Sequence, residues 1–396
     1  MKISRDAVRL AITVFVVAWG TNVSTPFLVL YKERLSLSDS ATVGIFVVYV
    51  AGILGTLLVA GPLSDRLGRK PLVVPFTVLS ALASLILLVG RDSLVVLLIG
   101  RFLLGVVSGA VLGVAAAWML ELLGDGNEQK SAVLTTVVTY FGFGFGPVSS
   151  SIYEQFFPHP LVVPFIIHAI ATALVIPLLL KVPETHPPEP TAPLRVQLGV
   201  PPESRRAFIT GVVPAAVWVF AFPSTAFALF PILLAESIDG SEVVLAGASG
   251  ALTSWGAFAA RPLVNRTGAR RALPIGIITG AAGYLLGIVA FGTDWWVLLL
   301  PGAVALGAAS GIISAGSLTV LGEISDDANR GKLTSTFYLM AYPGMAMPLL
   351  ITTLGSVVGD FRAVSGVMLV LLAVTALCFV AAVVTSREAI EAPAGA

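Results

Sequence analysis

Residues 61–70 read Gly-Pro-Leu-Ser-Asp-Arg-Leu-Gly-Arg-Lys, a charged segment between two long apolar runs. The segment concentrates one carboxylate and three cations in a chain of 396 residues, of which only 11% are charged and 57% are apolar. Ordinary globular domains carry about 25% charged residues. So little charge predicts that lipid surrounds most of the chain, and that residues 61–70 form a loop at the membrane surface.

Apolar runs continue along the chain on both sides of this loop. A helix needs about 20 mainly apolar residues to cross a bilayer. The first run follows a positively charged start that resembles a signal peptide, but it continues through Leu30 without a small-residue cleavage site, so we expect a retained span. The sequence predicts twelve spans, at 7–31, 41–63, 70–90, 94–122, 131–156, 160–182, 206–235, 242–265, 272–292, 296–322, 331–358 and 362–385.

The distribution of Lys and Arg predicts the orientation of these spans. With the N-terminus in the cytoplasm, 18 of the 23 basic residues fall in cytoplasmic segments. Only Lys32, Arg34, Arg91 and Arg362 then lie outside, and Arg101 lies within a span. Because cytoplasmic loops of membrane proteins are enriched in Lys and Arg, we expect both termini on the cytoplasmic side of a bacterial-type inner membrane.

The chain also divides into two similar halves. Residues 261–270 read RPLVNRTGAR, in register with residues 61–70 at an offset of 200, and Ser24-Thr25 recurs as Ser224-Thr225. Residues 183–205 are rich in proline, which favours an extended linker over a small cytoplasmic domain. The sequence therefore predicts a six-helix bundle over 1–182, a cytoplasmic linker over 183–205 and a second six-helix bundle over 206–396. Such duplication is typical of transporters.

Residues 61–70 resemble the loop signature of the major facilitator superfamily (MFS), G-x-L-[SA]-D-R-x-G-R-[RK], at every specified position. The resemblance implies two pseudo-symmetric six-helix bundles that expose a central cavity to each side in turn. It also implies a cytoplasmic latch in which Asp65 caps helix eleven, expected to begin near Gly331, because a helix N-terminus favours negative charge. The alternative is that these charges only fix topology. The implied latch residues are Gly61, Asp65, Arg66, Gly68, Arg69, Lys70 and Glu121.

Two further motifs resemble the drug:H+ antiporter branch of this family. Arg101 begins an R-x-x-x-G element on helix four, and a cation at that depth is costly unless it faces a wet cavity or a partner. The alternative is a side chain that snorkels to the outer interface. On helix five, Gly142, Gly146 and Pro147 resemble a gating G-P-x-x-G-G element, with serines at 150 and 151 in place of the glycine pair. Ordinary packing glycines are the alternative.

The resemblance places helices 1, 4, 7 and 10 around the cavity, with 2, 5, 8 and 11 beside them. Polar residues near the middle of these helices are candidate substrate contacts, although packing or an interfacial belt could equally explain each aromatic residue. The predicted cavity residues are Asn22, Thr25, Tyr49, Arg101, Tyr140, Trp218, Trp255, Ser310, Ser314, Tyr338 and Tyr342.

The predicted helix interiors contain no Asp or Glu. Proton coupling would then have to use Glu33, Asp65, Arg101 or His168, and a hydrogen-bonded structural role is the alternative for His168. Asn22 stands where related exporters can keep an acid. Its presence favours neutral or anionic substrates over cations.

We therefore predict a monomeric transporter in the lipid bilayer that exports small hydrophobic or amphipathic molecules and is driven by the proton gradient. We expect it to bind no cofactor. Transport of a sugar or another metabolite, and a non-transporting membrane sensor, are the alternatives. We expect no enzyme, because the sequence shows no nucleophile–base pair, phosphate loop or metal cluster, and the single Cys378 excludes a disulfide framework. The net charge of +1 gives no reason to expect nucleic acid as a partner.

Overall fold

The computed structural model describes residues 3–124, 126–191, 194, 198–235, 238 and 240–358, and its regular structure over these ranges is entirely helical. Ten of the helical segments are long and apolar enough to cross a membrane, and they coincide with the second to eleventh predicted spans. The protein is therefore a multi-pass membrane protein. The twelfth predicted span, 362–385, lies outside the described residues, so the total of twelve stays a prediction.

The first predicted span is broken in two. It consists of α1 (Arg5–Asn22) and α2 (Leu28–Arg34), and the turn between them contains Pro26. Proline cannot donate a backbone hydrogen bond, so the helix cannot continue unchanged through this position. Three charged residues in its first turns distinguish α1 from the ten more uniformly apolar segments.

The chain divides into two compact units. The described residues of 1–196 and 230–255 form one unit, and those of 197–229 and 256–396 form the other. The units are defined by the contacts within each of them. The domain boundaries predicted at 182 and 206 stay predictions. The predicted linker is not entirely extended, because α8 (Pro202–Gly211) begins inside it.

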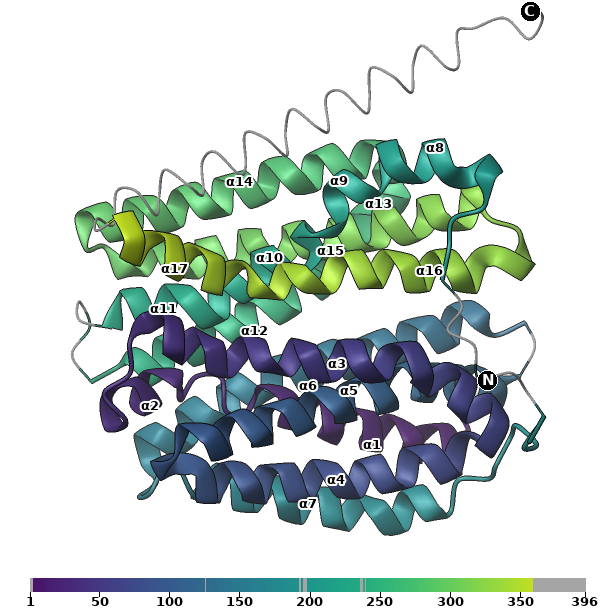
Figure 1. Cartoon of the computed structure of the whole chain (residues 1–396), viewed down its shortest axis with the longest axis horizontal. Helices are drawn as coiled ribbons and strands as arrows, with labels where there is room; N and C mark the ends of the chain where they lie inside the picture. The colour runs from purple at the N-terminus through teal and green to yellow at the C-terminus, as the bar shows by residue number, and fades with distance from the viewer. Residues whose placement is uncertain are drawn as a thin grey trace, which may run out of the picture. The chain divides into compact units, whose positions relative to one another are not determined.

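The first unit is a bundle in which the long helices lie side by side (Figure 1). Within it, α5 packs against α3 and α4, while α1 packs against α5, α6 and α7. Its core includes Leu10 and Val14 of α1, Val107 and Trp118 of α5, and Leu179 of α7, all fully buried. The long helices are α3 (Asp39–Leu67), α4 (Arg69–Val89), α5 (Leu94–Leu123), α6 (Glu128–Phe156) and α7 (Val163–Leu180), with the short η1 (Gly90–Asp92) between α4 and α5.

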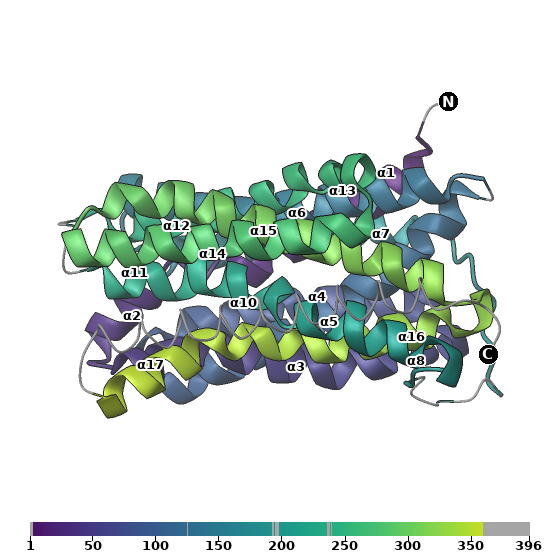
Figure 2. The same cartoon turned by 90° about the horizontal axis from the view of Figure 1, so that it is seen from above.

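The second half of the chain contains more short helical pieces. Helices α14 (Ala269–Thr293) and α15 (Leu299–Ile324) pack along each other (Figure 2). The remaining pieces are α9 (Val213–Ala216), α10 (Trp218–Ser224), η2 (Thr225–Leu229), α11 (Phe230–Leu233), α12 (Glu242–Ala260), α13 (Pro262–Thr267), η4 (Trp296–Leu298), α16 (Asp327–Ala341), η5 (Tyr342–Ala346) and α17 (Met347–Val358).

Prolines explain why the predicted spans 206–235 and 331–358 are interrupted. Pro223 leaves the carbonyl of Val219 without its usual helical donor, and the hydroxyl of Ser310 on α15 donates to that oxygen at 2.6 Å. The Ser224 hydroxyl, which lies 3.1 Å from the Ala221 carbonyl of its own helix, also lies 3.4 Å from the carbonyl of Gly344, four residues before a proline. Neighbouring side chains thus satisfy the backbone groups that proline frees inside the membrane.

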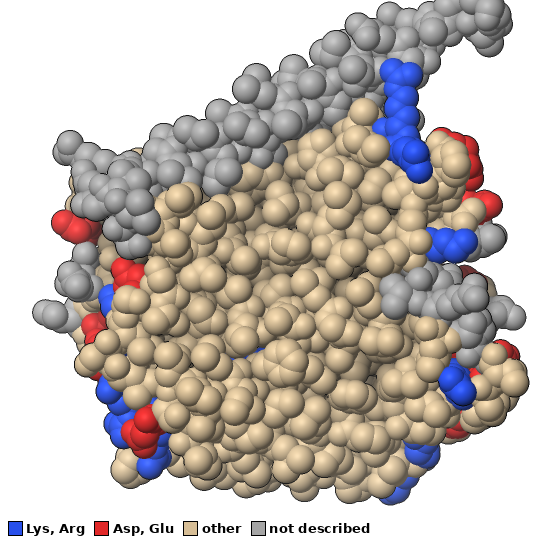
Figure 3. Space-filling view, in the orientation of Figure 1, with Lys and Arg blue, Asp and Glu red and all other residues tan. Residues whose placement is uncertain are grey.

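The charged residues follow the pattern expected of a protein surrounded by lipid. On the face shown in Figure 3, Lys, Arg, Asp and Glu gather near the ends of the helices, and the surface between them is formed by other residues. Large exposed apolar side chains such as Leu82, Ile170 and Leu174 cover the helix surfaces. Exposed apolar residues on this scale are stable only against an apolar solvent.

Candidate functional site

The charged loop at residues 61–70 builds a compact ionic cluster around Arg69. Nη1 of Arg69 donates to Asp65 Oδ1 at 2.6 Å, and its Nη2 donates to Glu121 Oε1 at 2.8 Å. The Arg69 residue is only 8% exposed. The structure therefore brings together Asp65 and Arg69, at the junction of α3 and α4, with Glu121 near the end of α5.

A fourth residue, Glu184, completes the cluster in a way that the sequence did not predict. Its carboxylate accepts from the backbone N of Arg69 at 3.0 Å and of Lys70 at 2.8 Å, so it caps the start of α4. The ammonium group of Lys70 in turn donates to the carbonyl of Leu180 at 2.6 Å, near the end of α7. The sequence shows a Glu close to the end of a predicted span, but nothing near it indicates which helix start its carboxylate reaches.

The glycines of the loop differ in what they do. Gly68 has φ +99°, and a Cβ there would lie 2.7 Å from Glu184 Oε2, so both backbone conformation and space favour glycine. A Cβ at Gly61 would meet no described atom within 4 Å, so no close approach requires glycine at this position in this structure. Arg66 lies in the last turn of α3 and is half-buried.

The helix that Asp65 was expected to cap starts earlier than predicted. Helix α16 begins at Asp327, not near Gly331, and the Asp326 side chain accepts from the backbone N of Asn329 at 2.9 Å. The sequence of this helix start contains its own capping residue, which the prediction overlooked. Capping by Asp65 stays a prediction.

Arg101 is fully buried in α5 and braces the break in the first span. At that break, the backbone N of Thr25 donates to Asn22, which leaves the carbonyl of Thr21 without a helical donor. Nη1 of Arg101 donates to this carbonyl at 2.8 Å and to Ser24 Oγ at 3.2 Å. Its side chain is therefore held in the interior of the first unit and does not snorkel to an interface.

The environment of the Arg101 guanidinium is aromatic. Its central carbon lies 5.4 Å from the Phe46 ring centroid and 5.1 Å from that of Tyr49, distances typical of cation–π contact. Nε lies 3.3 Å from the carbonyl of Ile45. Nη2 has no hydrogen-bond partner among the described residues, and the hydroxyl of Tyr31 also has none. The cation thus retains one buried, unused donor group.

The glycines of α6 allow neighbouring helices to approach closely. A Cβ at Gly142 would lie 2.6 Å from the carbonyl of Phe15, and one at Gly146 would lie 2.6 Å from that of Trp19, both on α1. Gly144 instead contacts the ring of Trp255 on α12. Close packing is therefore the observed role of these glycines.

Pro147 and the two serines after Ser149 connect α6 to its neighbours. The carbonyl that Pro147 frees, on Phe143, accepts from Asn22 Nδ2 at 3.4 Å. Ser150 donates to the carbonyl of Val23 at 2.5 Å, and Ser151 donates to that of Val243 at 2.9 Å. These serines stand where the G-P-x-x-G-G element has glycines. They form hydrogen bonds to neighbouring helices at positions where glycines would allow close packing.

The other predicted cavity residues of the first unit have diverse surroundings. Thr25 is 2% exposed, and its hydroxyl lacks a partner among the described residues. Tyr140 is half-buried, with its ring 6.5 Å from that of Phe143. Trp255 is 36% exposed, and its ring lies 5.9 Å from that of Phe141. Tyr140 and Trp255 are therefore the more accessible of these residues.

In the second unit, the predicted residues separate into buried and accessible groups. Trp218 is 3% exposed and packs on Phe222, and Ser310 and Ser314 are each 5% exposed. Tyr338 and Tyr342 are half-buried. The Tyr342 ring stacks on Phe220 with centroids 4.4 Å apart, and the Tyr338 ring follows at 6.0 Å from Tyr342. We call Phe220, Tyr342 and Tyr338 the aromatic ladder.

The remaining candidates for proton coupling lie apart from one another. His168 on α7 is fully buried, with Nδ1 2.7 Å from Ser84 Oγ and Nε2 3.0 Å from the carbonyl of Val16. Since a carbonyl only accepts, Nε2 carries the proton of that bond. His168 thus ties α7 to α1 and α4, which matches the structural alternative. Glu33 lies exposed on α2 and lines a pocket described below. Among the described residues, no group of three or more His, Cys, Asp or Glu could hold a metal ion.

Comparison with curated proteins gives partial matches. The Multidrug resistance protein MdtL of Shewanella oneidensis is 34% identical over 128 residues, which are 32% of each chain. The Shigella flexneri protein of the same name is 32% identical over 148 residues, 37% of each chain. The chain thus spans about a third of the length of the curated relatives that it matches.

Comparison with solved structures covers nearly the whole chain. The POT family transporter PepTSo superposes with a TM-score of 0.79 at 15% identity, over 99% of this chain and 100% of that one. The nucleoside transporter NupG gives 0.71 at 12% identity, over 95% and 99% of the two chains. At these identities, the likeness concerns the fold alone.

The family itself follows from the sequence. A sequence model of the Major Facilitator Superfamily matches residues 10–259 and 215–396, which together cover nearly the whole chain. The family and the solved structures are those of transporters, not of enzymes. The chain belongs to the Major Facilitator Superfamily.

Proposed function

We propose that the protein is a secondary active transporter that exports small hydrophobic or amphipathic molecules by alternating access, with the proton gradient as its energy source. The observation that carries this proposal is the match to multidrug resistance proteins over about a third of the chain. The ionic cluster of Asp65, Arg69 and Glu121 supports it, because a latch is useful only to a protein that changes conformation.

The substrates are neutral or anionic. Arg101 supplies a buried cation whose Nη2 has no partner among the described residues, and its acceptors there are two carbonyls and a hydroxyl, not a carboxylate. In the described spans, the carboxylates of Glu33, Asp65, Glu121 and Glu323 stand at helix ends. An uncompensated positive charge in a medium of low dielectric constant repels cationic drugs and attracts anionic or dipolar groups.

Aromatic surfaces provide the apolar part of recognition. The aromatic ladder of the second unit offers stacked rings with hydroxyl tips, and Trp255 and Tyr140 offer similar groups in the first unit. Rings of this kind bind bulky apolar molecules while their polar tips orient them. Aromatic groups able to contact an amphipathic substrate are therefore present in both units.

The proposal includes a topology of twelve spans with both termini in the cytoplasm of a bacterial-type inner membrane, and a monomer that works without a bound cofactor. The excess of Lys and Arg in the segments assigned to the cytoplasm supports this orientation. Reporter fusions at residues 36, 93 and 240, tested for activity outside the cytoplasm, check it. If the reporter is inactive at all three positions, the proposed orientation is wrong.

Growth inhibition with a panel of drugs tests the function. Cells that express the protein are expected to tolerate neutral and anionic amphipathic compounds better than cells that carry the empty vector. Equal susceptibility to every compound would contradict drug-type export and favour a metabolite substrate. Transport in proteoliposomes with an imposed proton gradient tests the energy source, since a rate that ignores the gradient removes proton coupling.

A further inference from the structure

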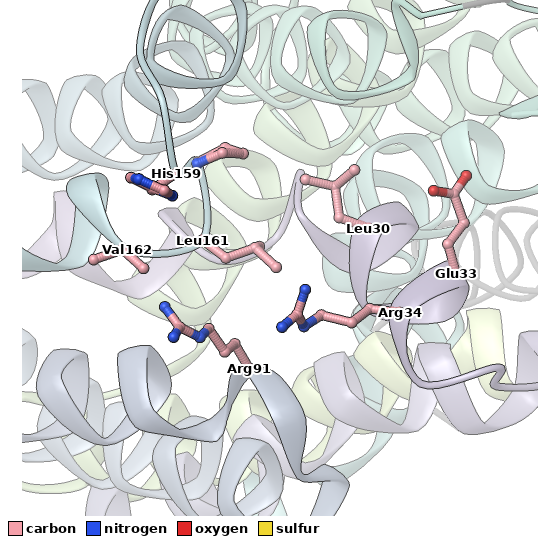
Figure 4. Close-up of a pocket in the computed structure, with 8 residues that line it drawn as sticks. Leu30, Glu33, Arg34, Arg91, His159, Leu161 and Val162 are labelled. Atoms are coloured by element: carbon pink, nitrogen blue, oxygen red, sulfur yellow. The ribbon is translucent and has the colours of Figure 1, made fainter.

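A pocket with a volume of about 630 Å³ lies at the end of the first unit remote from residues 61–70. It is formed where α2, η1 and the segment before α7 meet (Figure 4). This volume falls in the range of about 300–1,000 Å³ that small-molecule sites occupy. The proposed export mechanism does not use this pocket, and its lining combines cationic with apolar side chains.

The cationic side of the pocket is formed by Arg34 and Arg91, whose guanidinium groups point toward the same space (Figure 4). One carboxylate, Asp92, serves both: Arg34 Nη2 lies 2.6 Å from Oδ1, and Arg91 Nε lies 3.3 Å from Oδ2. Within the described part of the chain, Nη1 of Arg34 and both terminal nitrogens of Arg91 make no hydrogen bond. Two guanidinium groups on one carboxylate keep a net positive charge and free donors for a second anion.

His159 adds a third nitrogen-bearing side chain to this lining. Its backbone has φ +60°, a left-handed conformation that is uncommon for residues other than glycine. The carbonyl of His159 accepts from the backbone N of Val162 at 2.9 Å and of Val163 at 3.1 Å, which starts α7. This turn holds the imidazole at the pocket. The one acidic residue of the lining, Glu33, directs its carboxylate away from the two guanidinium groups (Figure 4).

The opposite side of the pocket is apolar. Leu30, Leu161 and Val162 line it, and the chain just before His159 carries Phe156 and Phe157, which are 75% and 48% exposed. A free inorganic anion would gain nothing from these groups. A molecule with an anionic head and an apolar tail would bury apolar surface as well as pair its charge.

The positions of the two arginines are unusual for a membrane protein. In the predicted topology, only four of the 23 basic residues lie outside, and Arg34 and Arg91 are two of them. Basic residues are depleted from outer loops. Two of the four converge on one pocket, which indicates a local requirement for positive charge.

We propose that this pocket binds the phosphate group of an anionic amphiphile, with the phosphate on Arg34 and Arg91 and the apolar part on Leu30, Leu161 and Val162. Guanidinium groups pair with phosphate oxygens through two parallel hydrogen bonds, which suits this ligand class. In the orientation proposed above, the pocket opens at the outer leaflet, where an anionic phospholipid supplies this chemistry. The inference does not depend on what the protein transports.

Native mass spectrometry of the purified full-length protein tests the proposal. The delipidated protein is titrated separately with phosphatidylglycerol, phosphatidylcholine, glycerol 1-phosphate and inorganic phosphate. Phosphatidylglycerol is expected to bind most tightly. Arg34→Gln and Arg91→Gln should each weaken it about fivefold, the loss of one partly exposed charged contact. Arg206→Gln, which changes an exposed arginine of α8, serves as the matched control.

The outcomes separate the possible sources of the phosphate. Suppose that inorganic phosphate binds as tightly as phosphatidylglycerol and loses affinity equally in Arg34→Gln and Arg91→Gln. This result would support the phosphate site but reject the lipid as the source of the phosphate. Equal binding of phosphatidylglycerol to Arg91→Gln and Arg206→Gln would overturn the site. Arg91→Lys retains one charge and should recover part of the affinity, so a loss due to misfolding can be recognised. None of these measurements requires transport, so failure here leaves the proposed function untouched.

Discussion

Arg101→Met is the substitution that best separates a binding role for Arg101 from a bracing role. Methionine keeps most of the length of the side chain but removes the guanidinium. The lost contacts are those to the Thr21 carbonyl, Ser24 Oγ and the Ile45 carbonyl, at 2.8, 3.2 and 3.3 Å. Hydrogen bonds inside membrane proteins contribute about 0.6 kcal/mol on average and up to about 1.7. The three contacts together therefore stabilise the fold by about 2–5 kcal/mol.

Removal of the buried positive charge, in contrast, stabilises the fold. A cation in the middle of a span costs about 2.5–3.5 kcal/mol on insertion scales. The two effects are of similar size, so we expect the free energy of unfolding of Arg101→Met to stay within about 2 kcal/mol of the wild type. Transport should fall at least about tenfold, because the unused Nη2 would contribute about 1.5–3 kcal/mol as a charged donor to substrate.

Two measurements on the same preparations check this prediction. Unfolding in a denaturing detergent, followed by circular dichroism, gives stability, and uptake into inverted proteoliposomes gives transport per folded molecule. Phe102→Leu is the matched control, because Phe102 is next to Arg101 but 41% exposed. A variant that loses several kcal/mol of stability but transports normally per folded molecule would refute the binding role and leave Arg101 as a brace of the broken helix.

Three further predictions follow from the contacts described above. Ser310→Ala should cost about 1 kcal/mol by exposing the Val219 carbonyl, and clearly less in a Pro223→Ala background that restores a backbone donor; a double-mutant cycle with no coupling would contradict this account. Gly68→Ala should lower stability by about 1–2 kcal/mol because of its positive φ, and an unchanged thermal unfolding midpoint would show that the turn adapts. Asp65→Asn should be expressed normally but transport poorly, and wild-type transport by this variant would count against the latch.

The spans could be predicted from the sequence because lipid imposes a simple requirement on each of them. In a chain with this composition, a run of about 20 apolar residues predicts a membrane-spanning helix. The breaks at proline have an equally local cause, the missing backbone donor, but the predicted spans were continuous through these positions. All ten spans that the structure describes as long and apolar had been predicted for these reasons.

Contacts between distant parts of the chain could not be predicted in the same way. Glu184 caps α4 across a separation of 115 residues, and no local pattern shows which helix start a carboxylate will reach. Asn22 and Ser310 were expected to face a cavity because they are polar residues in inner helices. Each instead donates to a carbonyl near a proline of another helix, a partner that only the packing reveals.

The start of α16 was misplaced for a different reason. Asp326 is a favourable N-cap residue and was visible in the sequence, but the hydropathy of the span began only after the polar turn that it caps. Apolar length locates the part of a helix in the hydrocarbon and not the polar turns beyond it. Predicted spans are therefore shorter than the helices wherever a capped polar turn precedes the membrane.

The side chains that serve proline-freed carbonyls have a mechanical consequence. At a regular position, bending a helix breaks a backbone bond that nothing replaces inside the bilayer. At Val219 and Gly344, the only local bond to break is that of one serine hydroxyl, which costs about 1 kcal/mol, less than twice the thermal energy. Flexing therefore costs less at these two points than at a regular helical position, and a bundle built from such helices can change shape by pivoting at them.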